Sequence, residues 1–550
     1  MNFNQYELPY PIDSRYKKKV VYFSMEYAIH QPLKIYSGGL GYLSGSHLRS
    51  AYELKQNLIG IGILWKYGYY DQARNQDQTL QIQWNEKIYN FLLDTEIRFQ
   101  VEIHGHLVWV KVLYLHPDTF QTAPLFLLTT DIPENDYVSQ TISHRLYDAN
   151  VATKIAQFIL LGVGGATLVD LLNINPDVYH INEAHAVSAA FYLKNKLGTM
   201  EAVREKFVFT THTPEEAGNE KHDLYLCENM SYFCGMPLDE VKKISDDSDT
   251  LFNHSLAALR FSRLSNAVSK LHGDVSNQMW NSYAGICDII SITNAQNWQY
   301  WADKTLYAQI NEKNEKQFID HKKTLKRNAI EVVADQTGKL LNPDVFTIVW
   351  ARRFAGYKRA NLLTRDLDRF TALLNNKKYP VQIVWAGKPY PLDYPAIGEF
   401  NYLVNLSKEY SNISVCTGYE LTLSKQLKQL ADLWLNNPRV PREASGTSGM
   451  TAAMNGAVNL STNDGWFREF VHHGENGFAV PLANYEDMSV QEQDYYDLEK
   501  LFEILENEIL PLYYQHPKKW IDISKRAMAD VLIQFDSNRM ADEYYKKLYI

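Results

Sequence analysis

The chain has 550 residues, 45% of them hydrophobic, and a formal net charge of −9 at pH 7. This length predicts roughly two to four domains with cores of their own. The acidic net charge argues against a nucleic-acid-binding or membrane-surface protein, because such proteins carry an excess of basic residues. The four cysteines lack metal-ligand spacing and fit a reducing compartment. With no signal-peptide pattern or membrane span, the sequence predicts a cytoplasmic protein without a metal centre.

Strands and helices alternate along the first half of the chain. Residues 20–28 predict a strand, which is followed by a glycine-rich turn at 37–41 and a helix that begins near His47. The segment 57–72 begins as a buried strand. It leads into a hairpin-rich stretch whose apolar segments lie at 97–103, 107–114 and 124–130.

The same rhythm continues to about residue 214. Residues 154–172 predict a helix interrupted by glycines, 177–186 a strand followed by a helix, and 206–214 a strand that ends in a loop. Such alternation predicts a mostly parallel sheet covered by helices.

The rhythm restarts after a charged, apolar-poor stretch at 311–328. Short apolar strands are expected at 345–353, 381–388 and 413–419. We therefore expect a domain boundary near 325–342. Two α/β halves predict a cleft between them, with ligands bound outside the carboxyl ends of the strands.

Residues 443–456, EASGTSGMTAAMNG, form a small-residue turn before a run rich in alanine and methionine. A turn of this kind at a helix start offers backbone N–H groups and the positive end of the helix dipole to an anion. Glu443 stands just before the turn. Its carboxylate can accept hydrogen bonds from hydroxyl groups, although a glutamate after a Pro-Arg loop is also commonly exposed to solvent.

A second motif, WARRFAGYKR at 350–359, brings four cations to the end of a predicted strand: Arg352, Arg353, Lys358 and Arg359. Fixed cations at a strand end suit phosphate binding, with arginine as a fork and lysine as a point charge. On charge alone, a solvated basic turn explains the cluster equally well.

Further candidate residues follow other predicted strands. Gly38, Gly39 and Gly41 allow close backbone approach at a helix start. Histidines in INEAHA and FTTHTP, and an asparagine in SITNAQNW, also follow strands, although a lone histidine is more often structural. Glycines at 162, 164 and 165 lack the strand-turn-helix context of a dinucleotide motif, and we interpret them as helix-packing residues.

From residue 22 to residue 549, these motifs resemble the α-glucan (glycogen, starch and maltodextrin) phosphorylases in their short bacterial and archaeal form. The resemblance implies an α/β fold of two facing Rossmann-like domains, the GT-B glycosyltransferase fold, with a cleft between them. Residues 1–330 would form an acceptor-side domain and 331–520 a donor-binding domain. Residues 521–550 would form a C-terminal helix that packs back on the core.

The resemblance also implies roles for individual residues. Arg353 and Lys358 would bind the substrate phosphate, and Arg352 would face a cofactor phosphate. The implied catalytic set is His212, Arg353, Lys358 and Glu443. The implied donor-phosphate set is Gly38, Gly39, Gly41, Arg352, Arg353, Lys358, Ser445, Gly446, Thr447, Ser448 and Thr451. The implied sugar-binding set is Glu183, His185, His212, Asn294 and Glu443.

One departure from the family pattern governs the functional expectation. Thr451 stands at the position of the lysine that forms the Schiff base with pyridoxal phosphate in the family, and a threonine cannot form an imine. The sequence also has Ser46, Ala295 and Asn297 where the family usually has Asp, Gly and His. We therefore expect no covalently bound cofactor.

Three functions remain open. The favoured one is a retaining hexosyltransferase, independent of pyridoxal phosphate, whose donor is a nucleotide-diphosphate sugar. A second is an α-glucan phosphorylase that holds pyridoxal phosphate non-covalently and releases glucose 1-phosphate. A third is an inactive glucan-binding or regulatory homologue. The expected partners are a sugar-phosphate donor and a carbohydrate acceptor such as an α-glucan, with no nucleic acid or membrane. A homo-oligomer stays open.

Overall fold

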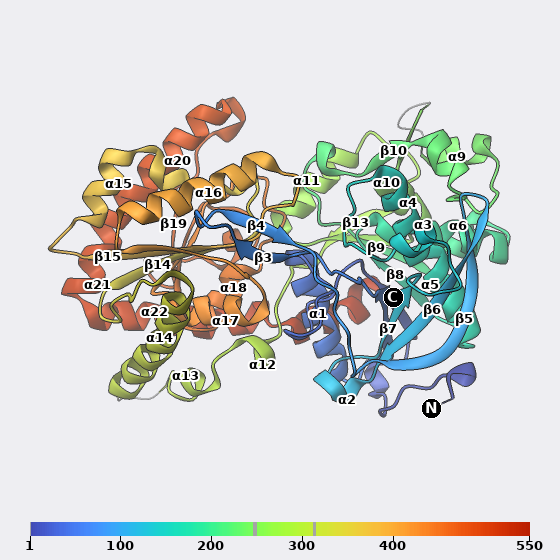
Figure 1. The fold of residues 1–550 in the computed structure, drawn as a ribbon, viewed down its shortest axis with the longest axis horizontal. Helices are drawn as coiled ribbons and strands as arrows, with labels where there is room; N and C mark the ends of the chain where they lie inside the picture. The colour runs from blue at the N-terminus through green and yellow to red at the C-terminus, as the bar shows by residue number, and fades with distance from the viewer. Residues whose placement is uncertain (1, 246–249, 312–314) are drawn as a thin grey trace. The chain divides into compact units, whose positions relative to one another are not determined.

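The structure is a computed structural model that describes residues 2–245, 250–311 and 315–550. The chain forms two compact units (Figure 1). The first comprises Met1–Tyr70, Trp84–Asn294 and Ser537–Ile550, and the second comprises Asp71–Gln83 and Ala295–Asp536. Both units are α/β, as predicted. The facing arrangement and the cleft stay predictions.

The first unit is built on a nine-stranded sheet with the order β13-β12-β9-β8-β1-β2-β7-β6-β5. Strands β13 to β7 are parallel, and β7, β6 and β5 are antiparallel. Their bounds are β1 Val20–Phe23, β2 Leu58–Ile63, β5 Leu93–Ile103, β6 His106–Leu115, β7 Leu125–Thr129, β8 Val178–Asn182, β9 Phe207–Thr210, β12 Leu264–Ala267 and β13 Asp288–Ser291. The strands expected in this region are all present.

Helices and one small hairpin complete the first unit. The hairpin pairs β10, Lys221–Asp223, with β11, Leu251–Asn253. The helices are α1 Gly39–Glu53, α2 Pro117–Phe120, α3 Tyr137–Thr141, α4 Val151–Ile159, α5 Gly165–Leu171, α6 Ser188–Leu197, α7 Met200–Arg204, α8 Leu224–Asn229, α9 Leu238–Ile244, α10 His254–Phe261, α11 Lys270–Trp280 and α23 Ser537–Glu543. Helix α1 begins at Gly39, so the expected start near His47 was wrong.

The second unit contains a six-stranded, wholly parallel sheet with the order β16-β15-β14-β17-β18-β19. The strands are β14 Phe346–Ala351, β15 Val381–Ala386, β16 Ile413–Cys416, β17 Leu433–Asn436, β18 Val458–Ser461 and β19 Gly477–Ala479. The helices are α12 Trp298–Trp301, α13 Lys304–Ala308, α14 Glu315–Thr337, α15 Leu367–Leu374, α16 Tyr394–Glu409, α17 Leu421–Leu430, α18 Ser448–Ala453, α19 Phe467–Phe470, α20 Val490–Ile504, α21 Leu510–Gln515 and α22 Pro517–Phe535.

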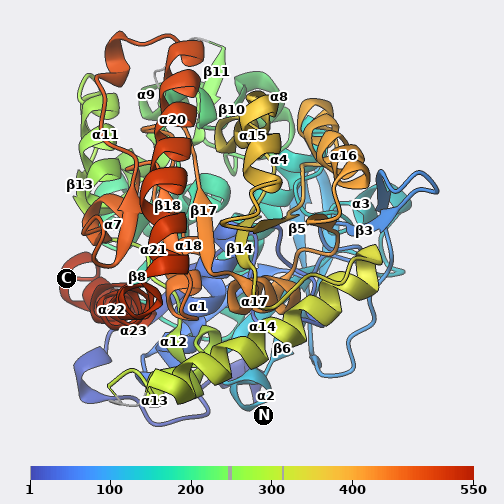
Figure 2. The same cartoon turned by 90° about the vertical axis from the view of Figure 1, so that its left-hand side faces the viewer.

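The units divide after Asn294, whereas the sequence placed the boundary near 330. That position falls inside α14, the long yellow-green helix of Figure 2. The charged stretch is not a linker, because α14 buries Ala329, Ile330 and Val333 in the core of the second unit. Its many charged residues occupy the remaining faces of an amphipathic helix.

The C-terminal segment also differs from the single helix expected over 521–550. Helix α22 ends at Phe535 in the second unit, and residues 537–550 return to the first unit as α23 and a further helical turn. Met540, Tyr544 and Leu548 are buried there, and they recur at helical spacing.

A short hairpin from the N-terminal half of the chain belongs to the second unit. It pairs β3, Asp71–Arg74, with β4, Leu80–Gln83. The Gln72 amide donates to the carbonyl of Gly387 at 2.7 Å and accepts from the N–H of Gly418 at 2.9 Å. The hairpin therefore contacts the carboxyl-end loops of β15 and β16.

The helix from α4 to α5 is interrupted by a π-helical turn that contains the glycines noted in the sequence. A Cβ atom on Gly162 would lie 2.1 Å from Ser188 Oγ, and one on Gly165 would lie 2.6 Å from the Phe23 ring. Both are packing glycines, as interpreted. Within the part of the chain that the structure describes, Val151–Leu171 alone has the length and composition of a membrane span, and it is mostly buried inside this unit.

The glycine contacts predict unequal effects of two neighbouring substitutions. Gly162→Ala forces a side chain against the backbone of α6 and should destabilise the protein by about 1–3 kcal/mol, the scale of an overpacked core. Gly164→Ala is the matched control, because its Cβ would meet nothing closer than 3.4 Å. Thermal and urea unfolding of both variants tests this prediction. Equal midpoints would contradict it.

Candidate functional site

A largely buried cluster of charged side chains in the second unit surrounds Glu443. Lys358 Nζ lies 2.8 and 3.1 Å from the two carboxylate oxygens of Glu443. Arg352 Nη1 lies 3.7 Å from the same carboxylate, and Arg352 Nη2 donates to Ser448 Oγ at 3.2 Å. The side chains of Arg352, Lys358 and Glu443 are only 8%, 12% and 13% exposed. The loops after β14 and β17 thus bring four of the predicted site residues together.

The charges in this cluster do not balance. Burial acts to raise the pKa of Glu443, but the charges of Lys358, Arg352 and Arg353 outweigh it, so the pKa is lowered. Glu443 is therefore ionised at neutral pH and offsets one of the two largely buried cations, Arg352 and Lys358, whereas Arg353 is exposed. The local excess is positive, which favours an anionic ligand.

A second carboxyl group lies directly behind Glu443 but does not cancel this excess. Asp464 accepts hydrogen bonds from the N–H groups of Glu443 at 2.9 Å and Gly465 at 2.8 Å. Burial, reinforced by the charge of Glu443, raises the pKa of Asp464 to about 8. Asp464 is therefore mostly protonated at neutral pH and holds the loop without adding negative charge.

Two buried polar atoms in the cluster lack a hydrogen-bond partner: Arg352 Nε and Ser445 Oγ. A buried donor without a partner costs roughly 1–3 kcal/mol, so an orphaned atom calls for an explanation. A bound oxyanion would accept from both. The sequence-predicted turn residues contribute here, since Gly446 has a φ of 81° that lets the chain turn from Ser445 into Thr447.

Thr451 lies in α18, and its side-chain hydroxyl is hydrogen-bonded within that helix. Thr451 Oγ1 donates to the carbonyl of Ser448 at 3.0 Å and approaches that of Thr447 at 3.4 Å, and the residue is 1% exposed. Arg352 and the turn before α18 fit a phosphate group. Thr451 offers no amine, so it does not fit a covalent link to pyridoxal phosphate.

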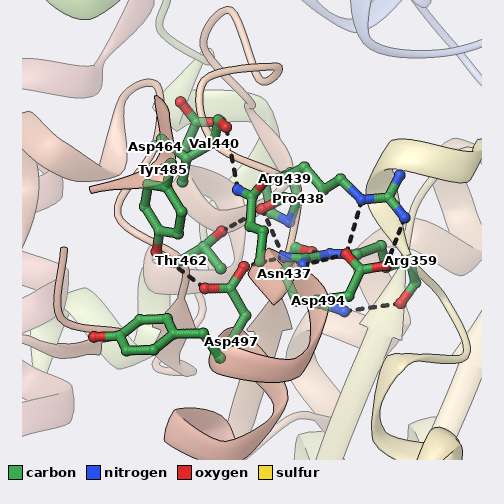
Figure 3. Close-up of polar contacts among 12 residues, drawn as sticks. Arg359, Asn437, Pro438, Arg439, Val440, Thr462, Asp464, Tyr485, Asp494 and Asp497 are labelled. Carbon is green, nitrogen blue, oxygen red and sulfur yellow. Dashed lines mark hydrogen bonds and ion pairs between the residues drawn. The ribbon is translucent and has the colours of Figure 1, made fainter. Parts of the chain in front are cut away.

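The fourth cation of the sequence motif is not part of the cluster. Arg359 is fully buried and donates to Asp494 at 2.9 Å and to Asp497 at 2.7 Å (Figure 3). It also donates to the carbonyl oxygens of Asn437 and Pro438. Arg359 therefore fixes the loop that leads to Glu443, and the expectation of four cations around one ligand-facing turn was wrong.

In the first unit, Glu183 and His212 follow the neighbouring strands β8 and β9. Glu183 Oε2 accepts from the N–H of His212 at 3.2 Å and from Thr213 Oγ1 at 2.9 Å. Burial raises the pKa of Glu183 to about 7 and lowers the pKa of His212 to about 3. At neutral pH His212 is uncharged and Glu183 is divided between its two protonation states. Glu183 also has a φ of 68°, a strained backbone for a residue other than glycine.

Of the remaining residues of the predicted sugar-binding set, Asn294 is buried and His185 is partly buried in the first unit. His185 Nδ1 and Asn294 Oδ1 have no hydrogen-bond partner. Burial lowers the pKa of His185 to about 4, so its ring is neutral. Both side chains thus retain unused polar atoms.

The glycine loop at 37–41 already holds a carboxylate of the protein. Glu26 Oε2 accepts from the N–H groups of Ser37 at 2.6 Å and Gly38 at 3.1 Å, and Tyr147 donates to Oε1 at 2.8 Å. A Cβ on Gly41 would lie 2.7 Å from Glu26, whereas Gly38 and Gly39 face open space. Glu26 therefore engages the N–H groups of Ser37 and Gly38, and phosphate binding by Gly38, Gly39 and Gly41 stays a prediction.

Sequence analysis missed several polar groups of the second unit. Lys388 and Glu420 form a buried ion pair of 2.8 Å in the loops after β15 and β16. Lys428 is buried on α17, with its ammonium 4.0 Å from the Trp301 ring centre. The lysine that ends VQIVWAGK could have been recognised, because it follows a strand next to β14. Across the described residues, no group of three His, Cys, Asp or Glu side chains could hold a metal ion.

Sequence comparisons identify a matching family and several relatives of this chain. The sequence pattern of the carbohydrate phosphorylase family matches residues 279–503. An uncharacterized protein of Methanocaldococcus jannaschii is 42% identical over 97% of this chain and 100% of its own length. The maltodextrin phosphorylase of Thermococcus litoralis is 33% identical over 97% of this chain and 71% of its own length. The glycogen phosphorylase of Aquifex aeolicus is 31% identical over 98% and 87%.

The fold and these likenesses place the chain among phosphorylase-like glycosyltransferase proteins. It belongs to the carbohydrate phosphorylase family.

The raised pKa of Glu183 predicts a specific pH dependence of stability. The ordinary pKa of the group is 4.5, so the unfolded chain releases this proton at lower pH than the folded chain. Stability is therefore lost as pH rises from 4.5 to about 7, by about 3 kcal/mol in total. Glu183→Gln removes this loss.

The measurement is the melting temperature at about pH 5 and about pH 8. The wild-type value should fall more between these pH values than that of Glu183→Gln. Glu216→Gln is the control, because this side chain is 68% exposed. An identical pH dependence in all three proteins would show that Glu183 ionises normally.

Proposed function

We propose that this protein is a retaining hexosyltransferase whose donor has a phosphate-bearing leaving group. The observation that carries this proposal is the positive excess around Glu443, with Arg352 Nε buried and without a partner. A phosphate would accept from that N–H and from Lys358, and so compensate both the charge and the missing hydrogen bond.

Donor binding would change the partner of Lys358. In the structure, Lys358 donates to both carboxylate oxygens of Glu443. A donor phosphate would draw Lys358 towards itself, and Glu443 would then accept from sugar hydroxyl groups. Arg353 and Lys358 would stabilise the negative charge that develops on the leaving oxygen, a contribution that grows in the transition state.

The finer proposal is that the donor is a nucleotide-diphosphate sugar and that no pyridoxal phosphate is needed. A diphosphate brings two phosphates in one leaving group, which matches three cations and the hydroxyls of Ser445, Thr447 and Ser448. Thr451 is buried and bonded within α18, so nothing at this position can anchor an aldehyde cofactor. The acceptor would be a carbohydrate such as an α-glucan.

A second candidate is an α-glucan phosphorylase with non-covalent pyridoxal phosphate. It is favoured by the names of the relatives from Thermococcus litoralis and Aquifex aeolicus. When bound, the cofactor would supply a second phosphate for proton exchange. Arg352 and Ser448 would hold that phosphate, and Arg353 and Lys358 would hold the substrate phosphate.

Removal of either ligand-facing cation should weaken phosphate binding. We expect Arg353→Ala and Lys358→Ala each to lower the affinity for the donor, or for inorganic phosphate, by about 1.5–3 kcal/mol, the scale of a charged hydrogen bond. Isothermal titration calorimetry measures this change. Arg526→Ala is the control, since Arg526 forms a surface ion pair with Asp530 and is 55% exposed. Unchanged affinity in folded Arg353 and Lys358 variants would support a merely solvated basic turn.

A ligand screen separates the candidate functions. A ligand that binds only the folded protein raises its melting temperature by mass action. We predict a clear rise with at least one nucleoside diphosphate or its sugar, and hexose transfer or release from that donor. Borohydride reduction of the purified protein, without added pyridoxal phosphate, should leave the intact mass unchanged.

Three other results would each revise this proposal. Stabilisation by pyridoxal phosphate alone, with glucose 1-phosphate formed from glucan and phosphate, would establish the phosphorylase. A reduced adduct on any lysine would overturn the absence of a covalent cofactor. A protein that neither ligand class stabilises, but that binds glucan, would be an inactive glucan-binding or regulatory homologue.

A further inference from the structure

A second buried lysine–glutamate pair lies at the carboxyl end of the same sheet. Lys388 Nζ is 2.8 Å from Glu420 Oε1, and the two side chains are 6% and 11% exposed. Glu420 occupies the N-cap position of α17, but its side chain makes no capping hydrogen bond there. Its carboxylate is directed to Lys388 instead of the helix end.

This pair repeats the geometry of Lys358 and Glu443. Both lysines follow adjacent parallel strands, β14 and β15, and both glutamates precede a helix. Each ammonium lies 2.8 Å from its carboxylate. Since side chains after parallel strands meet at one edge of the sheet, the two pairs belong to one ligand-binding edge.

The loops that carry the two pairs are in direct backbone contact. The Arg352 N–H donates to the carbonyl of Ala386 at 3.2 Å, and the Phe354 N–H donates to that of Lys388 at 3.3 Å. Next to Glu420, Tyr419 donates its hydroxyl to the carbonyl of Ala351 at 2.9 Å. Arg352 therefore contacts Glu443 of one pair and the strand that leads to Lys388 of the other.

The pair is also fixed from the side of the β3–β4 hairpin. Gln72 holds the carbonyl of Gly387 at 2.7 Å and accepts from the N–H groups of Gly418 at 2.9 Å and Tyr419 at 3.2 Å. These residues immediately precede Lys388 and Glu420. One amide side chain thus sets the spacing of both loops, which is the arrangement expected of a preorganised binding site.

A buried ion pair is weak evidence for stability, because the cost of desolvation offsets the attraction between the charges. Another buried pair of this unit shows what a structural pair does. Lys326, on α14, pairs with Asp432, which directly precedes β17, near the amino ends of β14 and β17. Lys326 also donates to the carbonyl of Val345, and Asp432 accepts from the N–H of Thr347. That pair ties two strands together, whereas Lys388 and Glu420 stand at the ligand-binding edge.

We propose that Lys388 and Glu420 form the outer half of the donor site and bind a nucleoside diphosphate. Lys388 takes the second phosphate, as a point charge suits, and Glu420 accepts from the vicinal hydroxyls of the ribose. On binding, each member of the pair exchanges its partner for one ligand group, so neither buried charge is left uncompensated. This inference rests on the proposed nucleotide-diphosphate donor.

The test compares ADP and UDP with inorganic phosphate, by calorimetric titration of the full-length protein. For whichever diphosphate the wild type binds, Lys388→Met and Glu420→Gln should each lower the affinity about tenfold or more, the scale of a charged hydrogen bond. Affinity for inorganic phosphate should stay within about twofold, because Arg352 and Lys358 are untouched. Lys388→Arg, which retains the charge, should restore part of the affinity for the diphosphate.

Lys326→Met is the matched control, since it breaks a buried pair at the opposite end of the strands. It should lower the melting temperature and leave the affinity of the folded protein for both ligands unchanged. Equal losses for phosphate and diphosphate in Lys388→Met, or no loss for either, would overturn the role of Lys388 while the proposed donor stands. A wild type that binds phosphate but neither diphosphate would overturn the donor proposal and this inference together.

Discussion

The charged cluster of the second unit depends on one unequal electrostatic balance around Glu443. Glu443 carries a single negative charge beside the largely buried Arg352 and Lys358, and the carboxyl group behind it, Asp464, is held mostly neutral by burial. A protein interior tolerates such an excess only where a ligand or solvent can complete it. The rest of the second unit supports this balance. Arg359 and its two aspartates hold the Glu443 loop, and the parallel strands fix the loops that carry the cations.

Much of the fold could be predicted because apolar runs of four to six residues are unambiguous when turns separate them. The strands β14, β15 and β16 lie inside the segments predicted for them. The domain boundary was placed inside α14 because a charged, apolar-poor stretch interrupts the strand-helix rhythm there, although Ala329, Ile330 and Val333 recur at helical spacing. The hairpin at 71–83 could not be assigned to the second unit, since its contacts are with residues more than 300 positions away in the sequence.

The sequence predicted which residues lie in the site but not their protonation states. The motifs located Lys358, Glu443 and the turn before α18, and the structure brings them together. Protonation states depend on burial, which the sequence does not display, so the raised pKa values of Glu183 and Asp464 had no signal there. Arg359 illustrates the same limit. Four neighbouring cations in the sequence look equivalent, yet one of them is fully buried against Asp494 and Asp497.

The route of the chain between the two units has a consequence for synthesis. The first unit contains residues 537–550, and its helix α1 is tied to them by the bonds from Ser50 to Ser537 and from Gln56 to Ala541. A ribosome makes those residues after every residue of the second unit. The second unit can therefore complete its contacts first, while α1 must wait for the last helix of the chain. Neither unit can be obtained as a single uninterrupted fragment.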